Sequence, residues 1–445
     1  MPSIECLTPR GELAAEIARV RERDANGHAA HALVATLAIL VQPIANAPAN
    51  IGFGLLVAMC ALRVHRLWRV WALMFRDLFW VLLVAWALWT GVTLLWSENV
   101  GYGARQWGGF RAILWVPMLW PVIDRWRWLV GALLAGVACA NGLQISQYFG
   151  GWPDVSARKL TGGGFHMYVF TGAWCAIAFA IWMMMAVSLK WKAALASVAF
   201  ASLAAIGLVI ASTRGSLVGA GVEVAVIAVL LAIRQRGWVK RAVVRAAVGA
   251  VILAAVWIVV GEKVQQKFDM LVVKDAAAGG ATNAEVPEQT VNAVKLNLQD
   301  GRMVMWEYAI GQWRQSPVTG LGFGTVLSRS KNLAKDDPTI SAAQRKGITE
   351  LGHPHSTWIQ TLAETGLVGF ALYGAWVIST LAIGWRLLGA SRPETCPEWL
   401  PPALLGAALA FFVASQFDCY QMNSTAFAIG LIPIGLLSGL RWLTR

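Results

Sequence analysis

Residues 352–369 read GHPHSTWIQTLAETGLVG and mark the point where a long polar segment turns back into apolar sequence. Two of the six histidines of the chain, His353 and His355, lie at this junction. An imidazole titrates near neutral pH, so a histidine here is suited to act as a base, an acid or a ligand. The rest of the chain is predicted to be a membrane scaffold that positions this junction.

The composition is that of an integral membrane protein. Of the 445 residues, 57% are hydrophobic and only 14% are charged, and the mean hydropathy is +0.57. A soluble domain carries about 25% charged residues. The 24 Trp residues point the same way, because Trp collects at membrane interfaces. The net charge of +13 does not indicate nucleic-acid binding, since the basic residues are scattered in short clusters between apolar runs.

Apolar runs of roughly 20 residues predict an all-α integral membrane protein with about twelve transmembrane helices. The short loops on the side of the N-terminus carry several times as many Lys and Arg residues as those on the opposite side. The positive-inside rule therefore predicts that both termini are cytoplasmic. The predicted spans are 29–47, 48–62, 78–96, 107–123, 128–147, 165–188, 193–212, 215–233, 244–260, 366–386, 401–417 and 422–440.

Four parts are expected along the chain. Residues 1–28 form a charged cytoplasmic segment, residues 29–260 contain helices 1–9, residues 261–353 form a large outer loop, and residues 354–445 contain helices 10–12. Within the loop, 276–282 is predicted to be a flexible linker and 300–313 an amphipathic helix that lies on the membrane surface or caps the bundle. The glycine-rich turn at 320–324 follows no predicted strand and lacks a Gly-Lys-Ser/Thr ending, which argues against a nucleotide loop.

Two arginines are predicted to lie on the outer face, on the same side as the histidine junction. Arg214 falls in a short turn between the seventh and eighth predicted spans, and Arg302 begins the loop helix. A guanidinium binds phosphate through two parallel hydrogen bonds, so both are candidates for holding an anionic group. The alternatives are an arginine that reaches to lipid headgroups at position 214 and a solvated helix-end charge at position 302.

Asp418, which follows the eleventh predicted span, is a candidate partner for His355. A carboxylate beside a histidine orients the ring and raises its basicity, although an interfacial helix-end charge is an equal alternative. His355 itself is interpreted either as a base or as a helix-capping residue, with the helix starting near Pro354 or Thr357. A continuous helix from there to Arg386 would place His355 roughly 15 Å above the hydrocarbon, at headgroup height.

The sequence contains two further candidate sites with ionisable side chains. A metal site at His353 and His355 would need a third or fourth ligand, and the loop offers only Glu350 nearby, so no metal is predicted. Glu223 is the one acid well inside a predicted span, where such groups mark ion or proton pathways or pair with a polar neighbour. A transporter would also need broken helices or internal repeats, and the sequence shows no convincing repeat.

The spacing around His355 resembles that of bacterial O-antigen ligases. His355 and Ser356, followed by nine residues, Gly366, two residues and Gly369, match the pattern H-[NSQ]-x9-G-x2-[GTY] of that family. Many members carry Asn where this chain has Ser356, which the pattern allows. A short-loop Arg-Gly pair at 214–215, an arginine in the preceding loop and about twelve spans also match the family's arrangement.

The resemblance implies a membrane glycosyltransferase with a GT-C-like fold in the bacterial inner membrane, with its active site in the periplasm. Such an enzyme moves a finished polysaccharide from undecaprenyl diphosphate to a sugar of the lipid A–core, without nucleotide, metal or other cofactor. By position, His355 would be the general base, Arg214 and Arg302 would bind the diphosphate, and Asp418 would match an acid in a late periplasmic loop.

Three alternatives remain at this point. O-antigen polymerases and protein O-oligosaccharyltransferases share a looser form of the motif. The acceptor would be a growing glycan for a polymerase and a protein side chain for an oligosaccharyltransferase. A polysaccharide or ion transporter is the third. For the ligase itself, single displacement by a hydroxyl that His355 activates would invert the anomeric centre.

Overall fold

The computed structural model describes residues 9–150, 164–211, 213–234, 301–333, 345, 348–349, 351–388 and 396–443. Within these ranges the regular structure is helical, apart from one isolated bridge between Ala45 and Phe165. The all-α prediction is confirmed for this part of the chain. The predicted ninth span, 244–260, and the predicted linker at 276–282 lie outside the described residues.

Five helical stretches in the described ranges are long and apolar enough to cross a membrane, or six if one bent helix pair counts as a single span. Four shorter helices are also apolar. The chain is therefore a multi-pass membrane protein by length and composition, whereas twelve spans and the sidedness of the loops stay predictions. The five stretches are Leu78–Trp96, Val100–Phe149, Tyr168–Ser188, Trp191–Ala211 and Thr357–Leu387.

The centre of the molecule is helix α18 (Ser424–Leu440), in which every residue from Thr425 to Leu440 is buried. A helix that is apolar on all sides belongs in the interior rather than at a surface. Helix α17 (Leu400–Ala414) and the segments η3 (Gly108–Leu114) and α7 (Trp115–Leu119) pack against it. Large aromatic rings fill the space beside it. Trp86 of α5 (Leu78–Val92) stacks on Trp376 of α16 (Thr357–Leu387), with the ring centroids 5.8 Å apart.

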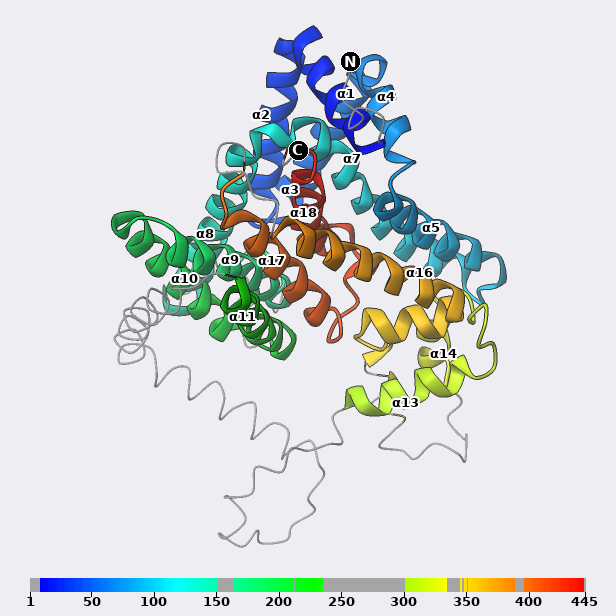
Figure 1. Cartoon of the computed structure of the whole chain (residues 1–445). Coiled ribbons are helices and arrows are strands. Elements are labelled where there is room, and N and C mark those ends of the chain that lie inside the picture. Colours follow the sequence, from blue (N-terminus) through cyan, green and yellow to red (C-terminus); the bar gives the residue numbers. More distant parts are fainter. Residues whose placement is uncertain are drawn as a thin grey trace, which may run out of the picture.

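The helices are distributed between two ends of the molecule (Figure 1). Helices α1 (Pro9–Arg23) and α4 (Val64–Met74) lie at one end, together with the end of α18. Helices α13 (Gly301–Trp313) and α14 (Thr325–Lys331) lie at the opposite end. Helices α9 (Tyr168–Ser188), α10 (Trp191–Ala211) and α11 (Arg214–Arg234) form one flank with α17, and α5 and α16 run along the other.

The predicted span at 107–123 lies within the stretch Val100–Phe149, but it is not one continuous α-helix. This stretch consists of the 3-10 segment η3, the short helix α7 and the 3-10 segment η4 (Trp120–Arg125). Pro117 and Pro121 remove backbone donors that a continuous α-helix would need. Val122 departs from helical geometry directly after the second proline.

Helix α16 is also not the single straight helix expected, because it breaks at Gly366. The backbone there has φ +66° and ψ −169°, a combination open essentially to glycine alone. A Cβ at this position would lie 2.2 Å from Val318 O. The expected height of about 15 Å for His355, which assumed a straight helix, is therefore unfounded.

The glycine-rich turn at 320–324 docks into this break. Gly322 N donates to Glu364 O at 2.9 Å, and Leu367 N donates to Pro317 O at 2.9 Å, so the turn and the residues just before it satisfy backbone groups on both sides of Gly366. The turn needs glycine because φ is positive at positions 320, 322 and 324. Its role is structural, and the first half of α16 (357–365) becomes a separate short helix that carries the histidine junction.

Candidate active site

His355 lies in a short segment, residues 352–356, which we call the histidine loop. Its backbone φ is +47°, and among the described residues it is the one non-glycine residue with a positive φ. A left-handed conformation costs a residue with a Cβ roughly 1–2 kcal/mol, and such strain collects at functional sites. The surrounding structure therefore holds His355 in a conformation that it would not prefer by itself.

Neighbouring helices hold the histidine loop from both sides. Trp306 of α13 donates from Nε1 to Pro354 O at 2.7 Å. Ser356 caps α16 by accepting a hydrogen bond from Ile359 N at 3.3 Å. The helix therefore begins at Thr357, and Pro354 lies in the loop rather than in the first turn.

Asp418 lies beside His355. The distance from His355 Nδ1 to Asp418 Oδ1 is 3.6 Å, and the two side chains are 26% and 20% exposed. This distance is an ion-pair contact rather than a hydrogen bond, and such contacts often tighten only when a substrate binds. Burial works to raise the pKa of Asp418, but the adjacent imidazole of His355 outweighs it and lowers the pKa below its ordinary value.

His353 supports the loop rather than binding a ligand. Its ring lies against that of His355 with centroids 3.9 Å apart, and its Nδ1 accepts a hydrogen bond from His355 N at 3.2 Å. Burial lowers the pKa of His353 to about 4, and the charges of His355 and Arg302 act in the same direction. His353 is therefore neutral at pH 7 and holds the backbone of its neighbour.

A buried row of polar side chains, which we call the polar ladder, extends from the histidine loop along α16. The Thr357 hydroxyl donates to Gln421 Oε1 at 2.6 Å, and Gln421 Nε2 donates to Gln360 Oε1 at 3.2 Å. Gln360 Nε2 in turn donates to Glu364 Oε2 at 2.9 Å. Positions 357, 360 and 364 share one helix face, so a satisfied polar network is built where apolar packing would be expected.

The turn that carries Asp418 is attached to the start of α16. Thr357 N donates to Ser415 O at 2.8 Å and to Asp418 O at 3.1 Å. These bonds satisfy an N–H of the first helical turn, which has no partner within its own helix. The same contacts fix the position of Asp418 relative to His355.

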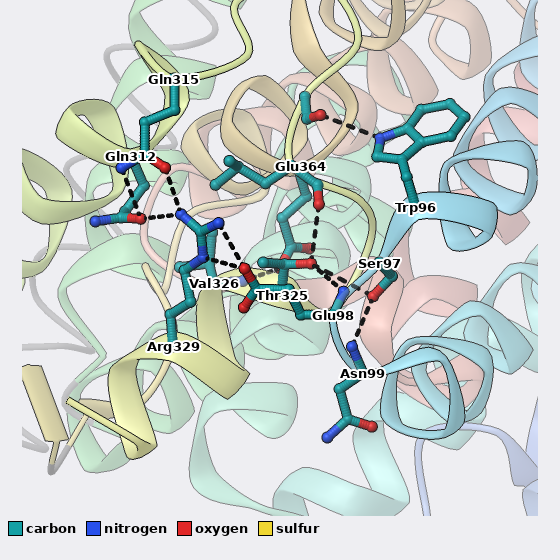
Figure 2. A network of polar contacts seen from close by, with 12 residues as sticks. Trp96, Ser97, Glu98, Asn99, Gln312, Gln315, Thr325, Val326, Arg329 and Glu364 are labelled. Atoms are coloured by element: carbon teal, nitrogen blue, oxygen red, sulfur yellow. Dashed lines mark hydrogen bonds and ion pairs between the residues drawn. The ribbon is translucent and has the colours of Figure 1, made fainter. Parts of the chain in front are cut away.

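Glu364 connects the polar ladder to helix α14 (Figure 2). Its Oε1 accepts from Val326 N at 3.0 Å, at the start of α14. Figure 2 also shows Arg329 of α14 bridging to Glu98 at 2.6 Å, in the turn before α6 (Val100–Trp107). Helix α14 is thereby bound both to the first half of α16 and to the turn between α5 and α6.

The two candidate arginines belong to different helices. Arg302 is the second residue of α13 and is half-buried, and its charge acts on His353. Arg214 is the first residue of α11 rather than part of a turn. At the next residue, Gly215, a Cβ would lie 2.7 Å from Phe417 Cβ, so the start of α11 packs against the residue that precedes Asp418. The placement of the Arg214 side chain lies outside the described structure.

Two other expectations concern ionisable groups. In the described ranges, no group of three or more His, Cys, Asp and Glu side chains is arranged to hold a metal ion. Glu223 is fully buried in α11, and both of its carboxylate oxygens lack a hydrogen-bond partner among the described residues. It lies roughly 13 Å along the helix from Arg214 and has no assigned role in the site.

Comparison with known families gives the context for this geometry. Residues 199–374 match the model of the family described as O-antigen ligase. This part of the chain is therefore similar to the O-antigen ligase family. Comparison with curated proteins found no match. The matched range includes Arg214, Arg302 and His355, whereas Asp418 lies beyond it and is brought to the histidine by the fold.

Sequence reasoning missed the polar ladder and the supporting role of His353. Thr, Gln and Glu at 357, 360 and 364 form no known catalytic pattern, although their common helix face was readable. Gln421 belongs to another turn, so no spacing rule connects it to them. A signal was present in one respect, because three polar residues on one face of an apolar helix need partners.

Proposed function

We propose that this chain transfers a finished O-antigen polysaccharide from undecaprenyl diphosphate to a sugar hydroxyl of the lipid A–core, at the periplasmic face of the inner membrane. The observation that carries the proposal is the contact between His355 and Asp418 on two loops that several helices hold together. The family match over residues 199–374 supports a membrane glycosyltransferase of the ligase or polymerase type. The donor, the acceptor and the residue roles are the further content of the proposal.

In this mechanism His355 is the general base. Because Nδ1 faces Asp418, the other ring nitrogen, Nε2, takes the proton from the acceptor hydroxyl. The hydroxyl oxygen attacks the anomeric carbon of the donor sugar, and the bond from that carbon to the diphosphate oxygen breaks. Undecaprenyl diphosphate leaves with the electron pair, and the anomeric configuration inverts. Finding the same anomer in donor and product would contradict the single displacement.

Arg302 and Arg214 are proposed to receive the negative charge that develops on the diphosphate. A guanidinium fork matches two phosphate oxygens, whereas an ammonium provides only a point charge. Arg214→Lys is therefore expected to impair transfer strongly, and near-normal transfer would indicate an arginine that only reaches to headgroups. Transfer is also expected to persist in chelator, and a loss that divalent metal restores would overturn the metal-independent scheme.

The decisive experiment is a lipopolysaccharide gel of a deletion strain complemented with the wild-type chain or with His355→Ala. A ligase predicts loss of the polymer ladder and accumulation of lipid-linked polymer, restored by the wild type but not by the variant. Core oligosaccharide that carries single repeat units would identify a polymerase instead. Unchanged lipopolysaccharide in the deletion strain would refute both readings, provided that immunoblots confirm the loss of the protein.

A further inference from the structure

Helix α4 (Val64–Met74) turns sharply away from the apolar helix that precedes it. The axes of α3 (Asn46–Leu62) and α4 differ by 98°, and Arg63 is the one residue between them. If α3 runs across the bilayer, a bend of this size places α4 close to the membrane plane. This end of the molecule lies opposite to the candidate active site (Figure 1).

Ion pairs at both ends of α4 fix its position. Arg63 is only 4% exposed, and its Nε donates to Asp24 Oδ2 at 2.9 Å. Beyond the other end, Arg76 Nη1 lies 3.2 Å from Glu12 Oε2 of α1. One face of α4 is buried in the core, where α1 packs against it, and this face consists of Leu67, Val70 and Met74. The bend is therefore a built feature of the fold.

The remaining surface of α4 is divided between an apolar edge and a basic edge. At 100° per residue, the apolar edge of Val64, Trp68 and Phe75 spans only about 40° of the helix circumference. These side chains are 49%, 53% and 60% exposed. Arg66 and Arg69 are exposed on a different side, and the Arg69 guanidinium lies 5.3 Å from the centroid of the Trp68 ring.

We propose that α4 is an interfacial helix that binds the anionic phospholipid headgroups of the leaflet on the N-terminal side. The apolar edge enters the boundary between headgroups and acyl chains, and the Arg66 and Arg69 guanidinium groups contact lipid phosphates. An amphipathic helix with Trp on one side and Arg on the other is suited to this position. Anionic lipids attract each such arginine, which makes the contact selective for lipid charge.

Continuity with the membrane-facing surface of α3 favours a bilayer over a protein partner. Ile51 and Leu55 of α3 are 64% and 58% exposed, and Leu62 at its end is 74% exposed. Leu62 ends this apolar surface and the exposed Val64 begins the apolar edge of α4, with only the buried Arg63 between them. A protein that covered only α4 would leave the adjoining apolar surface of α3 uncovered. Lipid covers both surfaces at once.

The depth of α4 can be measured on the full-length protein in vesicles. A fluorophore on Phe75→Cys reports the apolar edge, and one on Leu55→Cys reports the exposed surface of α3, with Cys6 and Cys139 replaced by Ser in both. The label at 75 is expected to be quenched most by lipids brominated near the headgroup end of the acyl chain. The label at 55 is expected to be quenched most by lipids brominated near the methyl end. If the label at 75 were quenched most by the deep bromines, α4 would be a re-entrant helix. If it were not quenched at all, α4 would be covered by protein or exposed to solvent. Either result overturns the proposal.

Charge selectivity is tested with the same label. In phosphatidylcholine vesicles that contain a fixed fraction of brominated lipid, brominated phosphatidylglycerol is expected to quench the label at 75 several-fold more effectively than brominated phosphatidylcholine. The double variant Arg66→Gln/Arg69→Gln is expected to abolish this preference, whereas Arg105→Gln/Arg314→Gln, which removes the same charge elsewhere, is expected to retain it. A preference that survives the first double variant, or is missing in the wild type, overturns the role of the two arginines.

Discussion

The two ends of the molecule each contain a histidine paired with an aspartate, and the pairs differ in their surroundings. His28 of α2 (Ala25–Val41) lies 3.0 Å from Asp124 and is 1% exposed. His355 lies 3.6 Å from Asp418 and is 26% exposed. His28 belongs to a regular helix, whereas the backbone of His355 is left-handed. The difference shows that a His–Asp pair alone does not make a site; access and an imposed backbone conformation distinguish the second pair.

The buried pair has a structural explanation. His28 and Asp124 connect α2 to η4, and Arg21 and Arg125 lie 3.6 Å from the same carboxylate. A group so shielded from solvent cannot meet a polysaccharide. The pair near α16 is instead reachable, and its two members come from different loops whose positions depend on tertiary contacts.

Replacing His355 is expected to have the largest effect on transfer. His355→Ala removes the proposed base, so we expect transfer to fall by a factor of about 10² to 10⁴, the usual contribution of general-base catalysis. The folded protein is expected to remain inserted in the membrane, because the side chain is not part of the core. Transfer is measured with purified protein, lipid-linked polymer and lipid A–core.

His28→Ala is the matched control for that variant. It is expected to lower the melting temperature while transfer per folded molecule stays within about two-fold, since a lost buried hydrogen bond costs stability rather than chemistry. If His28→Ala lost transfer in the folded protein and His355→Ala retained it, the assignment of the two pairs would be reversed.

The break in α16 tests whether the imposed geometry matters. Gly366→Ala places a Cβ 2.2 Å from Val318 O at a positive φ, so we expect a loss of stability of about 3 kcal/mol or more, with a parallel loss of transfer. Gly374→Ala in the same helix has open space around the new methyl group and is expected to be tolerated. Thermal unfolding in detergent measures both, and equal melting temperatures would contradict the docking of the glycine-rich turn.

Removing the carboxylate of Asp418 should have a smaller effect than removing the base. Asp418→Asn keeps the side-chain shape but loses the charge that orients and stabilises a protonated His355, so we expect kcat to fall by about ten-fold or more with little change in KM. Asp124→Asn, at the other pair, is expected to leave kcat unchanged. Equal kcat in Asp418→Asn and wild type would reduce Asp418 to a helix-end charge.

The pH dependence of stability should show the smallest effect. Burial lowers the pKa of His353 from 6.5 to about 4, so the unfolded chain takes up a proton at a pH where the folded chain does not. As far as His353 is concerned, the free energy of unfolding is therefore highest above pH 6.5 and declines as the pH falls toward 4. His353→Asn is expected to flatten the fall in melting temperature between pH 7 and pH 5. An identical fall in the two proteins would show that His353 does not contribute.

Much of the candidate site was predictable from local sequence. His355 was identifiable because it stands at a polar-to-apolar junction, and Asp418 because it follows an apolar run on the same predicted side. The sequence left Asp418 either as a partner of His355 or as a helix-end charge, and in the structure the two side chains lie 3.6 Å apart. The break at Gly366 was not predictable, because a glycine inside an apolar helical pattern is compatible with both a straight and a broken helix.

By itself, the sequence determined that this is an all-α membrane protein and which residues are chemically able to act. Apolar length, scattered charge and a histidine at a junction are local properties, and local properties can be read along the chain. Only the tertiary structure decided that His355 is held left-handed, that Gln421 and Glu364 belong to one network, and that residues 317–322 fill the break in α16. Those features depend on segments far apart in the chain meeting at hydrogen-bond distance, and no periodicity encodes such a meeting.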